Sequence, residues 1–230
     1  MLRGLLSIFR SSEPLRAMGE DFTQMLKLTY GMTVQAGDIY FGRPAPPEAQ
    51  TQIHDTDIQV NKLERTIRKR VITHLSLCEN TPSLPYCLLL MSLVKDVERL
   101  GDYAKNLSEV IALHGGPIPD DAILRELQEI RGGMEQLFAA TAEVFATSDR
   151  EHALELTRQG RDFTRRCEAL FGQIARSNYD ASTTLAVVLG TRYYKRIGAH
   201  VLNVLSSVIM PLHKLDYYDE QELDIEENAK

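Results

Sequence analysis

The chain has 230 residues and a formal net charge of −6, and this charge is concentrated in its last 15 residues. The segment Asp216–Lys230 holds seven acidic residues and one basic residue, which leaves 25 of each in the rest of the chain. A body with balanced charge argues against nucleic-acid binding, which favours a basic surface, and against a solvating, disordered chain. With 43% hydrophobic and 25% charged residues, the composition predicts a globular protein with a sizeable core.

The cysteines and the apolar runs exclude two further classes of protein. Cys78, Cys87 and Cys167 show no Cys-x-x-Cys spacing, so we expect neither a zinc knuckle nor a disulfide framework, and a cytoplasmic location is favoured. Every apolar run is far shorter than the roughly 20 residues of a membrane span. The first ten residues are apolar but contain Arg3 and Arg10, which makes a poor signal peptide. Such a segment can lie on a membrane surface, so peripheral association with the inner membrane stays open.

Breaks rich in proline, glycine or small polar residues divide the chain into six segments of roughly 25 to 30 residues. Within these segments apolar residues recur at helical spacing, and strict alternation of the strand type is absent. The first clear stripe comprises Leu63, Ile67, Val71, Leu75 and Cys78. Long helices with short connections pack as antiparallel neighbours. The pattern therefore predicts an all-α protein of six long helices.

The break at Gly115-Gly116-Pro117 divides the six helices into two sets of three. A weak repeat supports this division, because the runs 94–106 and 191–203, 97 residues apart, share Arg, Gly and Asn at equivalent positions. We expect two tandem antiparallel three-helix bundles, at residues 1–115 and 116–214, followed by an acidic, disordered tail at 215–230. One continuous six-helix bundle is the alternative.

Two neighbouring helices carry polar ridges that need an explanation. Glu98, Asp102 and Asn106 are spaced four residues apart on one helix, and the preceding helix carries Asp57, Asn61 and Glu64. Carboxylates that converge in this way repel one another unless a cation neutralises them, and hard cations prefer such oxygen ligands. The alternative is a solvated face with ion pairs between neighbouring turns.

A family resemblance bears on this choice. The run Lys95–Val110, KDVERLGDYAKNLSEV, resembles the signature of the PhoU family, D-x-E-R-[IL]-G-D-x-A-x-N-[IL]-x-E. The run 57–64 resembles the family's D-x-x-[IV]-N-x-L-E, and the run 192–203 resembles its R-Y-x-E-R-I-G-D-H-x-x-N. The resemblance extends over roughly residues 15–213 and implies a fold of two three-helix bundles.

The resemblance also implies a function. PhoU proteins regulate phosphate uptake through the high-affinity phosphate transporter and its sensor kinase, and they bind iron, zinc or other divalent metals at E/D-x-x-x-D motifs. The expected partners are therefore a membrane phosphate transporter or a histidine kinase. Members of the family often form dimers, so a homodimer is also expected.

The second half departs from the family pattern at its metal motif. Lys195 and Ala199 replace a glutamate and an aspartate, and Arg158 stands near the position of another acid. These changes reverse the local charge, so we expect this half to bind no metal and Lys195 to pair with Asp162 or another acid.

The sequence thus predicts one metal site, in the first half. The expected ligands are Glu98, Asp102, Asp57 and Asn61, and the residues do not distinguish Fe, Zn, Mg and Ni.

We expect a regulator and no enzyme, because no recognisable base or nucleophile accompanies the carboxylates. An accessory protein of another phosphate or anion permease, and a helical-bundle metal-binding protein or metalloenzyme, are the alternatives. The scattered histidines show no ligand spacing; His200 matches a family position and is expected to support neighbouring groups rather than bind metal. The basic cluster Arg65, Arg68, Lys69 and Arg70 is expected to be a solvated face or a partner-binding patch.

Overall fold

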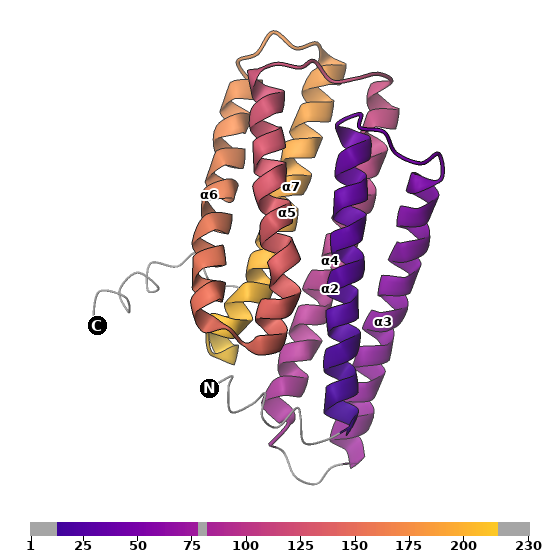
Figure 1. Cartoon of the computed structure of the whole chain (residues 1–230), viewed down its shortest axis with the longest axis vertical. Coiled ribbons are helices and arrows are strands. Elements are labelled where there is room, and N and C mark those ends of the chain that lie inside the picture. Colours follow the sequence, from indigo (N-terminus) through magenta and orange to yellow (C-terminus); the bar gives the residue numbers. More distant parts are fainter. Residues whose placement is uncertain (1–12, 78–81, 216–230) are drawn as a thin grey trace, which may run out of the picture.

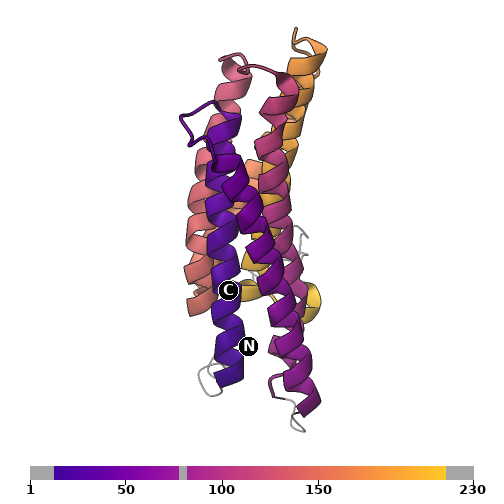
Figure 2. The same ribbon diagram turned by 90° about the vertical axis from the view of Figure 1, so that its right-hand side faces the viewer.

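The structure, a computed structural model, describes residues 13–77 and 82–215, and its long elements there are all α-helices (Figures 1 and 2). This confirms the all-α prediction with six long helices. The predicted acidic tail, apart from Leu215, lies outside the described residues, as do Cys78 and residues 1–12. The helices are α2 (Glu13–Tyr40), α3 (Ala49–Leu77), α4 (Leu84–His114), α5 (Ala122–Thr147), α6 (Arg150–Ile174) and α7 (Ala181–Ile209), followed by a short 3₁₀ helix, η1 (Leu212–Lys214).

Local chemistry explains where several helices begin and end. Aspartate side chains accept hydrogen bonds from the first backbone N–H groups of α5, α6 and α7, at Asp121, Asp149 and Asp180. Helix α4 starts with Pro85 in its first turn and ends at Gly115, which has the left-handed φ of 78° that glycine adopts without strain. The predicted division at residue 115 therefore falls in the turn between α4 and α5. The domain boundaries themselves remain predictions.

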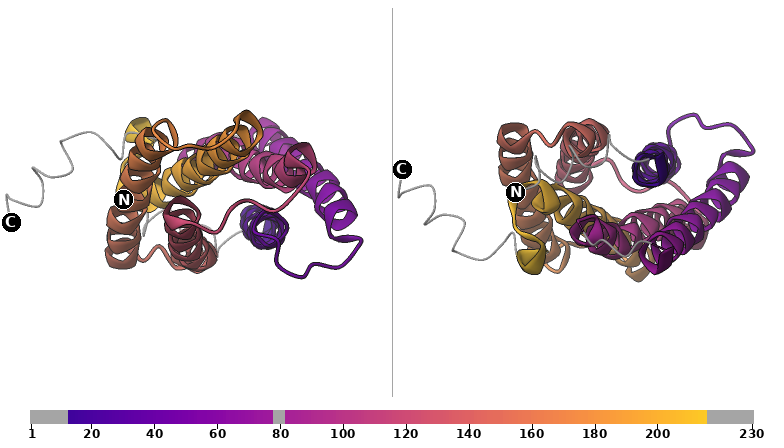
Figure 3. Two further views of the ribbon diagram at one scale, coloured as in Figure 1. Left: turned by 90° about the horizontal axis from the view of Figure 1, so that it is seen from above. Right: turned by 90° about the horizontal axis from the view of Figure 1, so that it is seen from below.

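The six helices lie along one long axis, with four of them in the middle and two on the outside (Figures 1 and 3). Helices α2, α4, α7 and α5 contact one another in a ring, and α4 with α7 is the most extensive pair. Helix α3 packs on α2 and α4 at one edge, and α6 packs on α5 and α7 at the opposite edge. Each half is thus a three-helix bundle, and the halves meet through the inner four helices.

Buried apolar side chains from all six helices form one continuous core. The two halves share this core through antiparallel helix pairs. Phe22 of α2 packs against Phe145 of α5 in a tilted arrangement with ring centroids 4.7 Å apart, and Tyr30 meets Phe138 edge to face at 5.6 Å. Burial of large aromatic groups on both sides of the contact stabilises the association of the halves.

A buried arginine also crosses between α2 and α5. Arg131 is 2% exposed, and its guanidinium donates to Asp38 on α2 and to Glu135 on its own helix, both at 2.6 Å. It also donates to the backbone oxygen of Val34 at 3.3 Å. A buried charge is tolerated when carboxylates and hydrogen bonds compensate it. Here they do so at Nε and Nη2 of Arg131, whereas Nη1 is buried without a hydrogen bond.

The largest helix contact, α4 with α7, contains a polar junction around Asp96. This carboxylate is 8% exposed, and its Oδ1 accepts from the Asn203 amide at 2.7 Å and lies 2.7 Å from Nδ1 of His200. Next to it, the ring of Tyr103 stacks on His200, and Arg196 donates to the Tyr103 hydroxyl at 3.2 Å. Specific hydrogen bonds of this kind fix how the two helices align along their lengths.

No helix in the described ranges is long and apolar enough to cross a lipid bilayer.

Replacing Asp96 with alanine should destabilise the protein by about 1–3 kcal/mol, because two donors on α7 lose their buried acceptor. The free energy of unfolding in urea measures this effect. Asp55→Ala, at an exposed aspartate on α3, is the control and should change it by less than about 0.5 kcal/mol. Equal losses in the two variants would show that Asp96 does not hold the halves together.

Candidate functional site

The polar ridges of α3 and α4 face each other, and a lysine lies between their acids. Lys105 Nζ donates to Asp57 Oδ2 of α3 at 2.9 Å and to Asp102 Oδ1 of its own helix at 3.2 Å. Antiparallel packing of α3 and α4 therefore brings two of the predicted ligands, Asp57 and Asp102, to one cation. In the described structure that cation is an ammonium group of the chain.

The Lys105 ammonium is held firmly in its charged form. Partial burial lowers its pKa, but the hydrogen bonds and charges of Asp57 and Asp102 outweigh that effect, so the pKa of Lys105 is raised above its ordinary value. Because the folded pKa is raised, the ion pair contributes stability at neutral pH and loses it only as the pH rises through that pKa.

The other two predicted ligands lie around this pair in different ways. Asn61 donates its amide to Asp57 Oδ2 at 3.4 Å, so it lies beside the carboxylate. Glu98 instead pairs with Lys95 at 2.7 Å and approaches Arg99 at 3.8 Å. Within the described ranges, no three His, Cys, Asp or Glu side chains come close enough to hold a metal ion. As arranged here, the carboxylates are neutralised by lysine and arginine, and the metal site remains a prediction.

One oxygen of the site has no partner. Asp57 is 7% exposed, and its Oδ1 is buried without a hydrogen bond. It faces Gly101 of α4, where an added Cβ would lie 3.4 Å away, an ordinary van der Waals distance. An unsatisfied carboxylate oxygen is costly in the interior and is a feature that a further cation or a water molecule would relieve.

In the equivalent region of the second half, an ion pair joins α6 and α7. Lys195 of α7 donates to Glu168 of α6 at 2.7 Å. The acid that pairs with Lys195 is therefore Glu168, and not Asp162. The residue that corresponds to Lys105 is Leu202, which is fully buried and packs against Gly160. This half therefore has an apolar contact where the first half has a lysine between two carboxylates.

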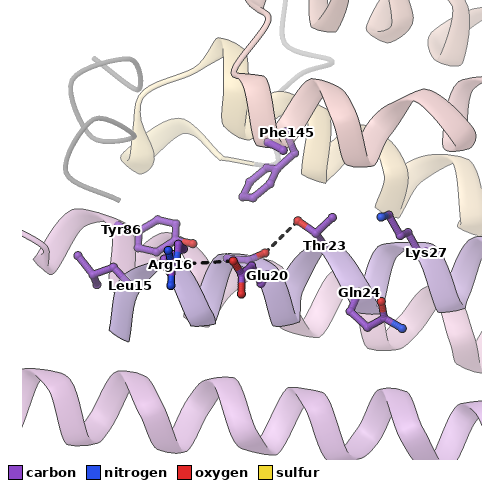
Figure 4. Close-up of a pocket in the computed structure, with 10 residues that line it drawn as sticks. Leu15, Arg16, Glu20, Thr23, Gln24, Lys27, Tyr86 and Phe145 are labelled. Carbon is purple, nitrogen blue, oxygen red and sulfur yellow. Dashed lines mark hydrogen bonds and ion pairs between the residues drawn. The ribbon is translucent and has the colours of Figure 1, made fainter. Parts of the chain in front are cut away.

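A pocket of about 370 Å³ lies elsewhere, between the first turns of α2, the start of α4 and the end of α5 (Figure 4). Leu15, Tyr86 and Phe145 form apolar walls, and Arg16 and Glu20 form an ion pair at its rim. None of the ten residues that line it is His, Cys or Asp. The pocket can hold an apolar group, but its lining shows no arrangement for acid–base or nucleophilic chemistry.

Two of the three cysteines lie in the described residues. Cys87 and Cys167 are buried and form no disulfide within the described ranges, and burial raises the pKa of the Cys167 thiol to about 12. Since the thiolate is the reactive form, Cys167 packs as a small apolar side chain.

The sequence analysis did not predict the contacts that two side chains of α4 make. Lys105 occupies a variable position of the family pattern, and only the packing of α3 shows that its ammonium reaches Asp57. Asp96 belongs to the pattern but faces α7 rather than the carboxylate ridge. The spacing of Asp96, six residues before Asp102, places it about 120° away from the ridge around the helix, which could have indicated this.

The chain is similar to known proteins in sequence over its first half and in fold over most of its length. Residues 22–111 match the family model of the PhoU domain. The crystal structure of the phosphate transport system regulatory protein PhoU from Streptococcus pneumoniae matches with a TM-score of 0.71 and 14% identity, covering 87% of this chain and 94% of that one. PhoU from Pseudomonas aeruginosa matches with a TM-score of 0.67 and 21% identity, covering 90% and 97%. No curated protein matches the sequence.

These findings confirm the resemblance predicted from the motif on α4. The family match includes both polar ridges, at Asp57 and at Glu98–Asn106. At 14% and 21% identity the two structures show a shared fold, which alone does not establish a shared activity. The second half, which lies outside the family match, is similar in fold.

Replacing Lys105 with methionine should destabilise the protein by about 1–2 kcal/mol at pH 7, because it leaves Asp57 poorly solvated and without its cation. Urea unfolding at pH 7 measures this loss.

Lys62→Met on the exposed face of α3 is the matched control and should leave stability nearly unchanged. A Lys105→Met variant as stable as wild type at pH 7 would show that the ammonium does not neutralise the ridge.

Proposed function

Because residues 22–111 match the family model of the PhoU domain, we propose that this chain regulates phosphate uptake by contact with a membrane phosphate transporter or its sensor kinase. The two similar structures come from proteins named as PhoU, one of them as a phosphate transport system regulatory protein. The observation that carries the proposal is the family match, which covers α4 as far as residue 111 and the polar ridge of α3 that faces it. An accessory role for another phosphate or anion permease is the second candidate.

The described side chains support a binding role rather than catalysis. Acidic side chains of the α3–α4 site are paired with Lys105, Lys95 and Arg99. A general base needs a free carboxylate or imidazole at a site that a substrate can enter, and this arrangement offers neither in the described residues. The long, helical surface suits contact with another protein, on the cytoplasmic side of a membrane. A homodimer remains part of the proposal.

The metal site belongs to the same proposal. Asp57 and Asp102, with Asn61 and Glu98 nearby, would hold a divalent or iron ion once Lys105 moves aside. The unpartnered Asp57 Oδ1 supports this, and the ammonium between the two aspartates opposes it. Such an ion would supply positive charge and fix the two helices to each other; the chain's own residues would bind and orient it.

Deleting the gene should change the rate of phosphate uptake, and expressing the chain should restore it. Uptake of labelled phosphate by cells, together with affinity capture of the chain, tests the proposal. We expect capture to recover a phosphate transporter or a histidine kinase. Unchanged uptake in the deletion strain, with neither partner recovered, would refute the proposed function.

Purified wild-type protein should contain a divalent or iron ion, and Glu98→Ala/Asp102→Ala should lack it, because the ion loses two carboxylates. Lys105→Gln should raise metal affinity, since it removes the ammonium that competes for Asp57 and Asp102. Elemental analysis and metal titration measure both.

Glu151→Ala/Glu155→Ala on α6 is the control, because it removes two exposed acids from the half that is expected to bind no metal. Equal metal content in wild type and in Glu98→Ala/Asp102→Ala would remove the metal from the proposal.

A further inference from the structure

The outer face of α3 carries a stripe of basic and apolar side chains. Ile58, Lys62, Arg65, Lys69 and Ile72 are all exposed and lie within about 80° of one another around the helix. Between residues 58 and 77 the sole acid is Glu64, which is buried and pairs with Arg68 on another face of the helix. The stripe is therefore positively charged along about 20 Å of α3.

Within the described residues, the bases of the stripe have no acidic partners. Arg68 pairs with Glu64, and Arg70 pairs with Asp21 of α2, so these two are neutralised by the protein itself. For Lys62, Arg65 and Lys69, the described structure contains no carboxylate within ion-pair distance. Three unpaired charges on one stripe create a local positive potential that favours an anionic surface.

The stripe ends in an exposed apolar cluster, defined here by Ile72, Leu77, Leu84 and Leu88. Leu77, the last residue of α3, is 78% exposed, Ile72 is 60% exposed and Leu88 of α4 is 47% exposed. The end of α3 and the start of α4, which carry these residues, lie at the lower end of Figure 1. Large aliphatic side chains gathered next to unpaired bases are unusual for a surface that faces only water.

The start of α2 lies at the same end of the molecule as the apolar cluster. Helix α2 begins at Glu13, at the lower end of Figure 1. The preceding twelve residues contain Arg3 and Arg10, no acid, and five large apolar side chains beyond the initial Met: Leu2, Leu5, Leu6, Ile8 and Phe9. These twelve residues are thus basic and apolar in composition, like the stripe and the cluster.

The other outer helix provides an internal comparison. Helix α6 occupies the edge opposite α3 (Figure 3), and its outward residues include three acids and two bases. These are Glu151, Glu155, Arg158, Asp162 and Arg165. None of the large exposed apolar residues of the described structure lies on α6. The basic and apolar character is thus specific to α3 and is not a general property of the outer helices.

We propose that the outer stripe of α3, with the apolar cluster at its end, docks on an anionic lipid surface. Lys and Arg side chains bind acidic headgroups through their charges while their methylene stems rest on apolar surface. Exposed Leu and Ile side chains at the same end enter the boundary between headgroups and acyl chains. Figure 2 looks onto α3, and in this view no other helix of the described residues lies in front of it.

The combination of groups favours lipid over the other anionic partners. Nucleic acid would use the charges but would leave the four aliphatic side chains of the cluster in water. An acidic protein surface would need carboxylates matched to each base, whereas a lipid layer presents anionic charge and apolar chains together and adapts to both. The proposal does not depend on the proposed function, because lipid binding can be measured without a transporter or a kinase.

The test uses the full chain and vesicles of neutral phosphatidylcholine with or without anionic phosphatidylglycerol. Wild type should sediment with the anionic vesicles, far less with the neutral ones, and less as salt rises. Lys62→Gln/Arg65→Gln/Lys69→Gln should weaken binding by more than about tenfold, since each basic residue near an anionic surface contributes roughly fivefold.

A second triple variant controls for net charge. Arg125→Gln/Arg150→Gln/Arg165→Gln removes three exposed bases from the second half and should bind nearly as wild type does. Equal losses in the two triple variants would show that net charge alone is responsible and would overturn the proposal.

The apolar cluster has its own matched pair of variants. Leu77→Ser/Leu88→Ser should weaken binding several-fold, whereas Leu113→Ser/Leu185→Ser, at exposed leucines of the opposite end, should not. Circular dichroism checks that all variants keep their helices. Wild-type protein that does not sediment with anionic vesicles would overturn the proposal. If in that case the α3 variants also lose capture of the transporter or kinase, the stripe is a protein-binding face.

Discussion

The contact between α4 and α7 is the constraint on which the rest of the structure depends. It joins two three-helix sets, and at its polar centre Asp96 meets His200 and Asn203 at distances of 2.7 Å. Hydrophobic packing alone tolerates sliding of one helix along another, whereas short hydrogen bonds to a buried carboxylate select one alignment. Because α4 also packs against α2 and α3, this alignment determines which residues of the first half remain on its surface.

Helix α4 therefore has two distinct polar faces. One side meets α7 through Asp96 and Tyr103, and another meets α3 through Asp102 and Lys105. The α3 side holds two carboxylates close together, and the ammonium of Lys105 donates to both of them. A cation bound there would compete with a group of the chain itself, so occupancy would be sensitive to the position of one side chain. In the second half an apolar residue, Leu202, takes the equivalent place.

The two halves thus keep one fold while their surfaces differ. Their cores are built from the same kinds of apolar contact, so packing preserves three helices in each half. Their outer helices experience no such constraint, since solvent accepts many side chains. Helix α3 carries unpaired bases and exposed aliphatic groups, and α6 carries mixed charges. Differences in function between the halves are therefore expected on these outer faces and on the α3–α4 ridge, away from the shared core.

The sequence by itself determined the helical class, the six segments and the family resemblance, because helical periodicity, proline breaks and a local motif are properties of neighbouring residues. It also placed Asp57 and Asp102 on facing ridges. The tertiary structure decided what those ridges hold. That Lys105 reaches Asp57, 48 residues away, and that Asp96 meets His200, 104 residues away, depends on the rotation and alignment of packed helices. A periodic pattern fixes which residues share a face, but only packing fixes which face another helix covers.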